Sequence, residues 1–244
     1  MKEYLIFLKK LHDDYVLMSK RINFNKKDIR QLYLIGLYGS IIELTGCLIV
    51  LTDNKCWTGI PPLFRSLLET YVEFDNLYRN EEYVFYMDAS FLNQWLNILE
   101  NAKQNENPFL RDIAKSDMLD SQIKEHSDKL EYLKQRGFHP LHIFERFERA
   151  GLKNEYKSIY KLDSGHAHSN INALIDRHYD MSGDDVKVVF YKDKADESII
   201  MYIDSIAGLL VDATEKVHLF FKTDMKKEIE EIKLSFSKLR ERYK

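Results

Sequence analysis

Apolar residues return every three or four positions along most of this chain, the spacing that places them on one face of an α-helix. The first such stretch runs from Tyr4 to Met18, and a more continuously apolar one runs from about residue 27 to 51. A third begins at Pro61 and Pro62 and ends near residue 80, since proline is tolerated in the first turn of a helix. A fourth runs from about 82 to 103. This part of the chain is therefore predicted to form four helices.

The middle of the chain is more charged and less regular. Residues 109–135 carry few large apolar side chains, which predicts a solvated helix or helix pair that projects from the core. Gly137 and Pro140 end this segment, because proline disrupts a helix interior. The helical spacing returns over about 141–150 and again over 153–179. We expect both of these segments to be helices.

The last part of the chain contains its one convincing strand pattern, at residues 186–191, where β-branched and aromatic residues follow a turn-like stretch. Two further helices are expected at about 197–222 and 224–242. The pattern as a whole predicts an all-α fold, a multi-helix bundle with a small β excursion near 186–191. We expect a single helical domain over residues 1–244, with 109–135 as the projecting segment.

Composition narrows the class of protein. Only 9 Gly and 4 Pro in 244 residues argue against a collagenous, low-complexity or turn-rich all-β chain. The formal net charge of −3 argues against a broadly basic nucleic-acid-binding protein, although a local basic patch stays open. Cys47 and Cys56 are too few for a disulfide framework. The most apolar stretch, Ile41 to Leu51, contains Glu43 and is too short to span a bilayer. We expect a cytoplasmic protein with no membrane partner.

Two charged residues interrupt the apolar third helix. Arg65 and Glu69 stand four positions apart, and the large apolar residues around them indicate that this row lies near the core. Tyr160, Ser164 and His168 form a polar stripe at the same spacing on another predicted helix. A buried charge is costly unless it is paired and hydrogen-bonded. We therefore expect these five residues to meet and treat them as the candidate catalytic set.

These motifs resemble those of a widespread bacterial family of helical proteins of unknown function. Its members carry an R-x3-E helix followed by a Y-x3-S-x3-H helix, which here are Arg65 to Glu69 and Tyr160 to His168. The resemblance covers roughly residues 30 to 220. It implies a helical fold but no defined activity.

A more distant resemblance is to the HEPN group, helical nucleotide-binding and ribonuclease domains of prokaryotic toxin and antiphage systems. The HEPN signature is R-x4-6-H, and the forward match runs from Arg136 to His142, across the Gly137 and Pro140 break. Arg65 and His168 could supply the same pair from separate helices, which departs from the signature. The resemblance implies RNA or a nucleotide as ligand, a homo-oligomer, and a partner protein from the same defence or toxin system.

Three hypotheses follow for the candidate site. In the first, the protein is a metal-independent endoribonuclease, in which His168 transfers a proton and Arg65 stabilises phosphate charge. In the second, the set belongs to a non-catalytic module that binds a small ligand, or it is purely structural and fixes helix packing. In the third, a metal is held by Glu69, Asp163, His166 and His168. The chain lacks the common nucleotide-binding and zinc-hydrolase motifs, so no cofactor or metal is expected.

Overall fold

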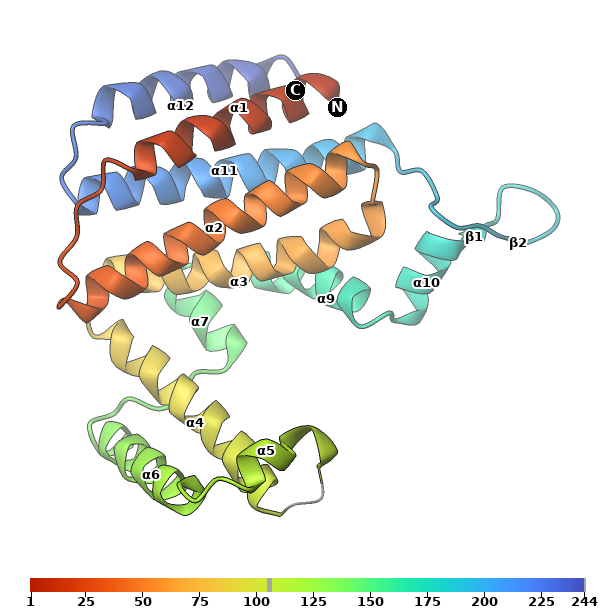
Figure 1. The fold of residues 1–244 in the computed structure, drawn as a ribbon. Coiled ribbons are helices and arrows are strands. Elements are labelled where there is room, and N and C mark those ends of the chain that lie inside the picture. Colours follow the sequence, from red (N-terminus) through yellow and green to blue (C-terminus); the bar gives the residue numbers. More distant parts are fainter. Residues whose placement is uncertain (105–106, 244) are drawn as a thin grey trace. The chain divides into compact units, whose positions relative to one another are not determined.

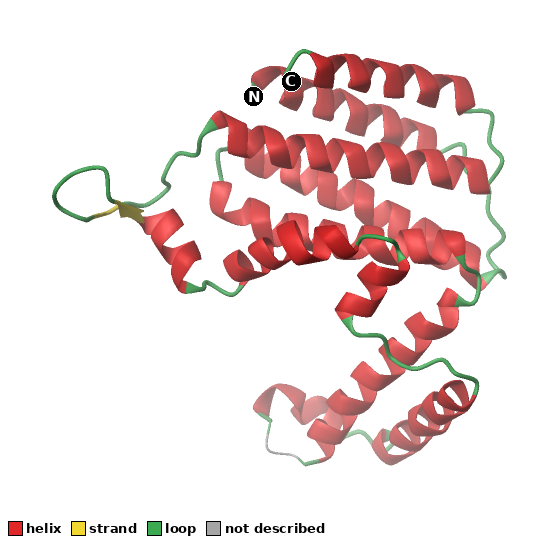
Figure 2. Cartoon of the chain, turned by 180° about the vertical axis from the view of Figure 1, so that it is seen from behind, coloured by secondary structure: helices red, strands yellow, loops and turns green. Residues whose placement is uncertain are grey.

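The structure is a computed structural model that describes residues 1–104 and 107–243. Within these ranges the chain is mostly helical and contains a two-stranded antiparallel sheet, so the predicted fold class is confirmed (Figure 2). The chain forms two compact units. One consists of Met1–Arg79 with Phe147–Lys244, and the other consists of Asn80–Arg146.

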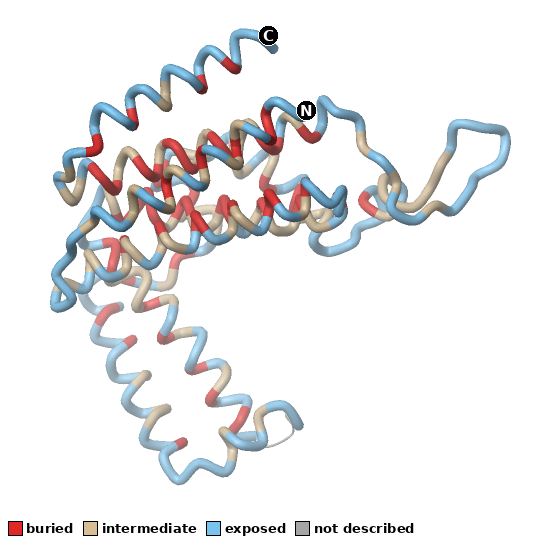
Figure 3. The backbone as a smooth tube through the Cα atoms, turned by 45° about the horizontal axis from the view of Figure 1, so that its top comes forward, coloured by how far each residue is buried: buried red, intermediate tan, exposed pale blue. Residues whose placement is uncertain are grey.

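The first unit is built around long helices that pack along one another (Figure 1). They are α1 (Lys2–Ser19), α2 (Ile29–Asp53), α3 (Ile60–Arg79), α11 (Asp196–Phe220) and α12 (Lys226–Glu241). Helix α2 contacts α1, α3 and α11, and α12 contacts α11. The buried positions face these contacts, whereas the outward faces are exposed (Figure 3). The five helices agree closely with the segments that the apolar spacing predicts.

Local signals explain where the helices α2 and α3 begin. The side chain of Asp28 accepts a hydrogen bond from the Gln31 amide, which satisfies one of the free N–H groups at the start of α2. Helix α3 follows a short 3-10 turn, η1 (Trp57–Gly59), and has Pro61 in its first turn, where no partner for an N–H is needed.

Helix α2 is longer than the apolar run that the sequence analysis considered too short to span a bilayer. By length and composition alone, the 25 residues Ile29–Asp53 are sufficient to cross a membrane, whereas the apolar run within them looked too short. Such a helix is weak evidence of a span, because the core helix of a soluble protein passes the same test. In the structure α2 has a buried face that includes Leu34, Tyr38, Ile41 and Leu48.

The second unit contains α4 (Tyr83–Lys103), η2 (Pro108–Leu110), α5 (Arg111–Ala114) and α6 (Leu119–Gln135), and α7 (Ile143–Arg149) begins in it. The charged segment 109–135 therefore contains a short helix, α5, and a long helix, α6. Helix α6 contacts α4, so this segment shares a core with the fourth predicted helix. That core consists of six buried apolar residues: Ala89, Leu92, Leu96, Leu130, Leu133 and Phe138.

The helix predicted over 153–179 is divided into several pieces. These are α8 (Lys153–Glu155), a π-helical turn η3 (Tyr156–Tyr160), α9 (Lys161–Ala167) and α10 (Ile171–His178). The chain turns between α9 and α10, where Ser169 has a φ of +50°. The expectation of one continuous helix was wrong, because local hydrogen bonding after α9 competes with helical pairing.

The small sheet lies after α10 and is shorter than predicted. Strand β1 (Tyr179–Asp180) pairs antiparallel with β2 (Lys187–Val188), and Tyr179 lies opposite Val188. Of the strand predicted at 186–191, only the two residues of β2 are in a strand. Its apolar side chains do not enter a core, since Phe190 is 75% exposed and Tyr191 is 92% exposed.

Candidate functional site

The structure brings the five candidate residues together between α3 and the segment around α9. Arg65 and Glu69 lie one turn apart on α3. Tyr160 is the last residue of η3, Ser164 lies within α9, and His168 directly follows α9. Helices α3 and α9 contact each other, which explains how residues about 100 positions apart in sequence meet. We call this group the Arg65 cluster.

Arg65 is the centre of the cluster. Its Nε donates a hydrogen bond to Glu69 Oε1 at 2.9 Å, and its Nη1 lies 3.4 Å from Ser164 Oγ and 3.2 Å from His168 Nε2. The guanidinium carbon also lies 5.0 Å from the centre of the Tyr160 ring, within the range of a cation–π contact. Arg65 is therefore held in place by contacts on several sides.

Glu69 and Tyr160 are joined to each other as well as to Arg65. The Tyr160 hydroxyl donates to the same Glu69 oxygen, Oε1, at 2.8 Å. Tyr160 is buried, and burial together with the hydrogen bond to Glu69 raises its pKa to about 12. Burial acts to lower the pKa of Arg65, but its interactions with Tyr160 and Glu69 outweigh this effect and raise it. Tyr160 therefore stays protonated and Arg65 stays charged at neutral pH.

His168 forms the exposed edge of the cluster. It is the residue that caps the C-terminal end of α9, and it is exposed, whereas Arg65 is partly buried. Arginine has no acceptor, so in the 3.2 Å contact the His168 Nε2 must be the acceptor. In the tautomer that makes this hydrogen bond, the proton of the imidazole is on Nδ1.

The cluster contains two side-chain groups, a guanidinium and an imidazole, whose chemistry suits a reaction at a phosphate. A guanidinium presents a planar set of donors that matches phosphate oxygens. An unprotonated imidazole is a proton acceptor near neutral pH. Because His168 is exposed and Arg65 retains partial exposure, with 23% of its side chain accessible, both groups can be reached from solvent.

Two residues of the metal hypothesis, Asp163 and His166, lie outside the Arg65 cluster. Asp163 is fully buried, and its Oδ1 accepts a hydrogen bond from the Tyr202 hydroxyl at 2.7 Å. Burial raises the pKa of Asp163 to about 6, although the Tyr202 hydrogen bond opposes the shift. Within residues 1–104 and 107–243, no three His, Cys, Asp or Glu side chains are grouped so that they could hold a metal ion.

A large cavity lies in the first unit but does not contain the Arg65 cluster. Its volume is about 860 Å³, and its lining includes Trp57, Lys161, His166, Arg177 and Lys194. Tyr160, Ser164 and His168 belong to the same helical segment as Lys161 and His166 but do not line the cavity. Sequence reasoning missed this cavity, because the turn after α9 and the loop before α11 are needed to form it.

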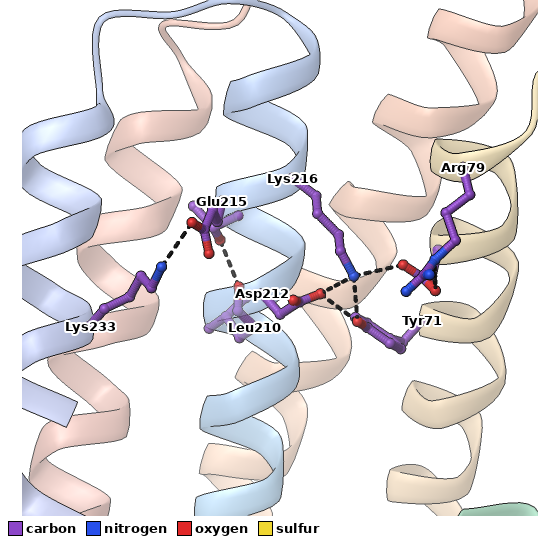
Figure 4. Close-up of polar contacts among 9 residues, drawn as sticks. Tyr71, Arg79, Leu210, Asp212, Glu215, Lys216 and Lys233 are labelled. Atoms are coloured by element: carbon purple, nitrogen blue, oxygen red, sulfur yellow. Dashed lines mark hydrogen bonds and ion pairs between the residues drawn. The ribbon is translucent and has the colours of Figure 1, made fainter. Parts of the chain in front are cut away.

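A second polar cluster joins α3 to α11 and was also missed (Figure 4). The Lys216 ammonium lies 2.6 Å from Asp75 Oδ1, 2.5 Å from Asp212 Oδ2 and 3.0 Å from the Tyr71 hydroxyl. Arg79 binds the other Asp75 oxygen at 2.7 Å. Asp75 is 1% exposed. The charges in this group compensate one another, which is the arrangement of a structural ion cluster.

The forward match to the HEPN signature does not lie on one helix. Arg136 caps the end of α6, Gly137 has a φ of +89°, and His142 precedes α7. The Arg136 guanidinium instead lies over aromatic rings, 4.9 Å from the centre of Phe85 and 5.5 Å from that of Phe138. This pair is therefore not a candidate site.

Comparison with known proteins gives one match. The model of a family of unknown function, DUF5677, matches residues 31–186, which is more than half of the 244-residue chain and includes all of the Arg65 cluster. No curated protein and no solved structure matches the chain significantly. The extent of the family match shows that the chain belongs to the DUF5677 family.

Proposed function

We propose that the Arg65 cluster is a metal-independent RNA-cleaving site, and that the protein is an effector or accessory protein of a bacterial defence or toxin system. The observation that carries this proposal is the 3.2 Å contact between Arg65 Nη1 and the exposed His168 Nε2. It supports the proposal because a guanidinium, which can bind a phosphate, lies beside an imidazole, which can act as a base, and His168 is exposed to solvent.

The proposed reaction uses the 2′-hydroxyl of RNA as the nucleophile. When the substrate binds, Arg65 Nη1 turns from His168 Nε2 to the phosphate, which frees the lone pair of that nitrogen. His168 Nε2 then takes the proton of the 2′-hydroxyl, O2′ attacks the neighbouring phosphorus, and the bond from phosphorus to O5′ breaks. The O5′ leaving group takes a proton from water, and the hydroxide that remains is neutralised by the proton that His168 releases to solvent. The products are a 2′,3′-cyclic phosphate and a 5′-hydroxyl, and His168 returns to its starting state. Arg65 donates to the non-bridging oxygens as charge develops on them. Glu69 and Tyr160 hold Arg65 in position, and Ser164 is a further donor beside it.

The distant HEPN resemblance supports the assignment to a defence or toxin system and to the cytoplasm. The net charge of −3 gives the chain little general attraction for nucleic acid. We therefore propose that RNA contacts are local to the cluster or are completed by a second copy or by a partner protein of the same system.

A non-catalytic role is the second candidate, and one observation favours it. Glu69 Oε1 accepts from both Arg65 and Tyr160, so these three side chains already have hydrogen-bond partners within α3 and η3. Such a network can fix the packing of two helices without any substrate. Under this alternative His168 is dispensable, because it adds only one contact at the exposed edge.

Expression in bacterial cells distinguishes the two candidates. We expect the wild-type protein to slow growth and degrade RNA, and we expect His168→Ala to abolish both effects. His139→Ala, at an exposed histidine of the second unit, is the matched control and should behave as wild type. Thermal unfolding of the purified variants shows whether the fold is kept. If folded His168→Ala protein degrades RNA as wild type does, or if wild type leaves RNA intact, the proposal is wrong.

A further inference from the structure

The cavity beside α9 is built from three separate parts of the first unit. Residues of η1 and the start of α3 form one wall, the segment from η3 to α10 forms another, and the loop before α11 with the first turns of that helix forms the third. We call it the α9 cavity. At about 860 Å³ it lies within the size range of small-molecule sites. Its lining is independent of the Arg65 cluster, so the inference below does not rest on the proposed function.

The charged groups of the cavity favour an anion. Four cationic side chains and two carboxylates line it: Lys161, Arg177, Lys192, Lys194, Asp176 and Asp193. This local positive excess contrasts with the net charge of −3 for the whole chain. Lys194 pairs with Asp176, and the Lys192 ammonium donates to the Tyr179 carbonyl at 2.7 Å, so both lysines are held at the cavity.

Three nitrogen atoms of the lining are buried without a hydrogen-bond partner among the described residues. They are Trp57 Nε1, His166 Nδ1 and Arg177 Nε. Trp57 is 7% exposed, and its indole nitrogen can only donate. Arg177 uses its Nη2 to bind the His166 carbonyl at 2.6 Å, which leaves Nε as a second donor. A buried donor without a partner is unfavourable, so a ligand rich in acceptors would be favoured here.

The rest of the wall is apolar. Ile60, Ala173 and Ile199 are buried and line the cavity together with the Tyr202 ring. Sites for small organic ligands commonly combine such a surface with a few polar groups that fix the orientation of the ligand. An inorganic anion alone would leave these apolar groups without contact.

We propose that the α9 cavity binds a small organic phosphate in which a planar ring system is joined to the anionic group, and that a mononucleotide is the ligand class that fits. The phosphate would accept hydrogen bonds from the cationic and buried donor groups, and the ring would cover the apolar wall. The site is distinct from the Arg65 cluster, although both use residues of the segment from η3 to α9.

Calorimetric titration of the full chain tests the ligand class. The probes are AMP, UMP, adenosine and inorganic phosphate. We expect at least one of the two nucleotides to bind at least tenfold more tightly than adenosine and inorganic phosphate, because only a nucleotide supplies both parts. Equal affinity for inorganic phosphate would reduce the cavity to a simple anion site, and equal affinity for adenosine would remove the role of the cations. Either result, or no saturable nucleotide binding, would overturn the proposal.

Two tryptophan variants test whether the nucleotide binds in the α9 cavity. Trp57→Phe keeps an aromatic ring but removes the buried donor, and we expect roughly tenfold weaker nucleotide binding. Its thermal stability should fall only by the packing lost with the smaller ring, because the lost donor has no hydrogen-bond partner among the described residues. Trp95→Phe changes the other tryptophan, in the second unit, and should leave affinity unchanged. His168→Ala should also keep wild-type affinity, which separates this inference from the proposed RNA chemistry. Unchanged binding by folded Trp57→Phe protein would contradict the site.

Discussion

At the residue scale, individual hydrogen bonds determine how the polar side chains of this protein are oriented. Glu69 Oε1 receives hydrogen bonds from Arg65 and Tyr160, which fixes the direction of the guanidinium. The sequence spacing indicated that these residues meet, because a charge within an apolar helix needs a partner. It did not indicate that His168 would be exposed, since that depends on where α9 ends.

Asp163 gives a prediction for pH dependence. Its pKa is about 6 in the folded protein and 3.8 as an ordinary carboxyl, so between these values the folded protein holds a proton that the unfolded chain releases. The contribution of Asp163 to stability is therefore greatest below pH 4, falls as the pH rises, and is fully lost above pH 6. Relative to Asp163→Asn, wild type should lose on the order of 3 kcal/mol across this range.

Chemical unfolding of both proteins at several pH values measures this difference. Asparagine can still accept the hydrogen bond from Tyr202, so packing around the site is largely kept. Asp184→Asn removes one negative charge at an exposed position of the hairpin and is the matched control. If the difference between wild type and Asp163→Asn does not change between pH 4 and pH 7, the carboxyl is not buried as the structure places it.

At the element scale, the apolar spacing predicted the long helices well and the segment around α9 poorly. Long amphipathic helices repeat their signal over many turns, so α2, α3 and α11 were found with ends within a few residues. The break after α9 depends on one local arrangement. A Cβ at Gly165 would lie 2.4 Å from Asn170 Nδ2, so this glycine allows Asn170 to fold back and cap α10. A single sequence does not reveal such a close approach.

The same spacing rule that found Arg65 and Glu69 could have found the ion cluster of Figure 4. Asp75 and Arg79 stand four apart on α3, as do Asp212 and Lys216 on α11, and both pairs lie among apolar residues. The pairing between the two helices needed the structure. For the α9 cavity, in contrast, the sequence spacing contains no such signal, because loops and short helices form much of its lining.

Lys216 provides a prediction at this scale. Lys216→Met removes the cation that joins Asp75 to Asp212 and should cost roughly 3 kcal/mol in the free energy of unfolding, as for a broken buried ion pair. Lys233→Met is the control, because Lys233 pairs with Glu215 at a more exposed position, where less than about 1 kcal/mol is expected. Denaturant unfolding measures both values, and equal losses would show that the burial of Asp75 has no energetic consequence.

At the scale of the whole molecule, the chain forms two compact units with separate cores. The single helical domain over residues 1–244 stays a prediction. The charge and the few large apolar residues of 109–135 suggested a projecting segment, but they did not indicate that α6 buries apolar residues against α4. Phe138 lies 4.8 Å from the Phe85 ring centre and 5.1 Å from that of Tyr86, all within the second unit.

Phe138→Ala tests the separation of the two cores. The lost packing should cost about 3–5 kcal/mol, the usual range for a buried phenylalanine. Hydrogen exchange read by mass spectrometry should then increase over the described part of Asn80–Arg146, while α1, α2 and α11 keep their protection. Equal loss of protection throughout the chain would mean that the two units unfold as one.

Metal-independent cleavage of RNA by His168 and Arg65 stays a proposal. The most direct measurement is a single-turnover assay with purified protein, a chelator such as EDTA, and a labelled single-stranded RNA. The account predicts products with 2′,3′-cyclic phosphate and 5′-hydroxyl ends, no cleavage where the nucleotide is replaced by its 2′-deoxy form, and no cleavage by folded His168→Ala protein. Cleavage that requires a divalent metal, or that continues at the wild-type rate in His168→Ala, would contradict the proposal of a metal-independent site at His168 and Arg65.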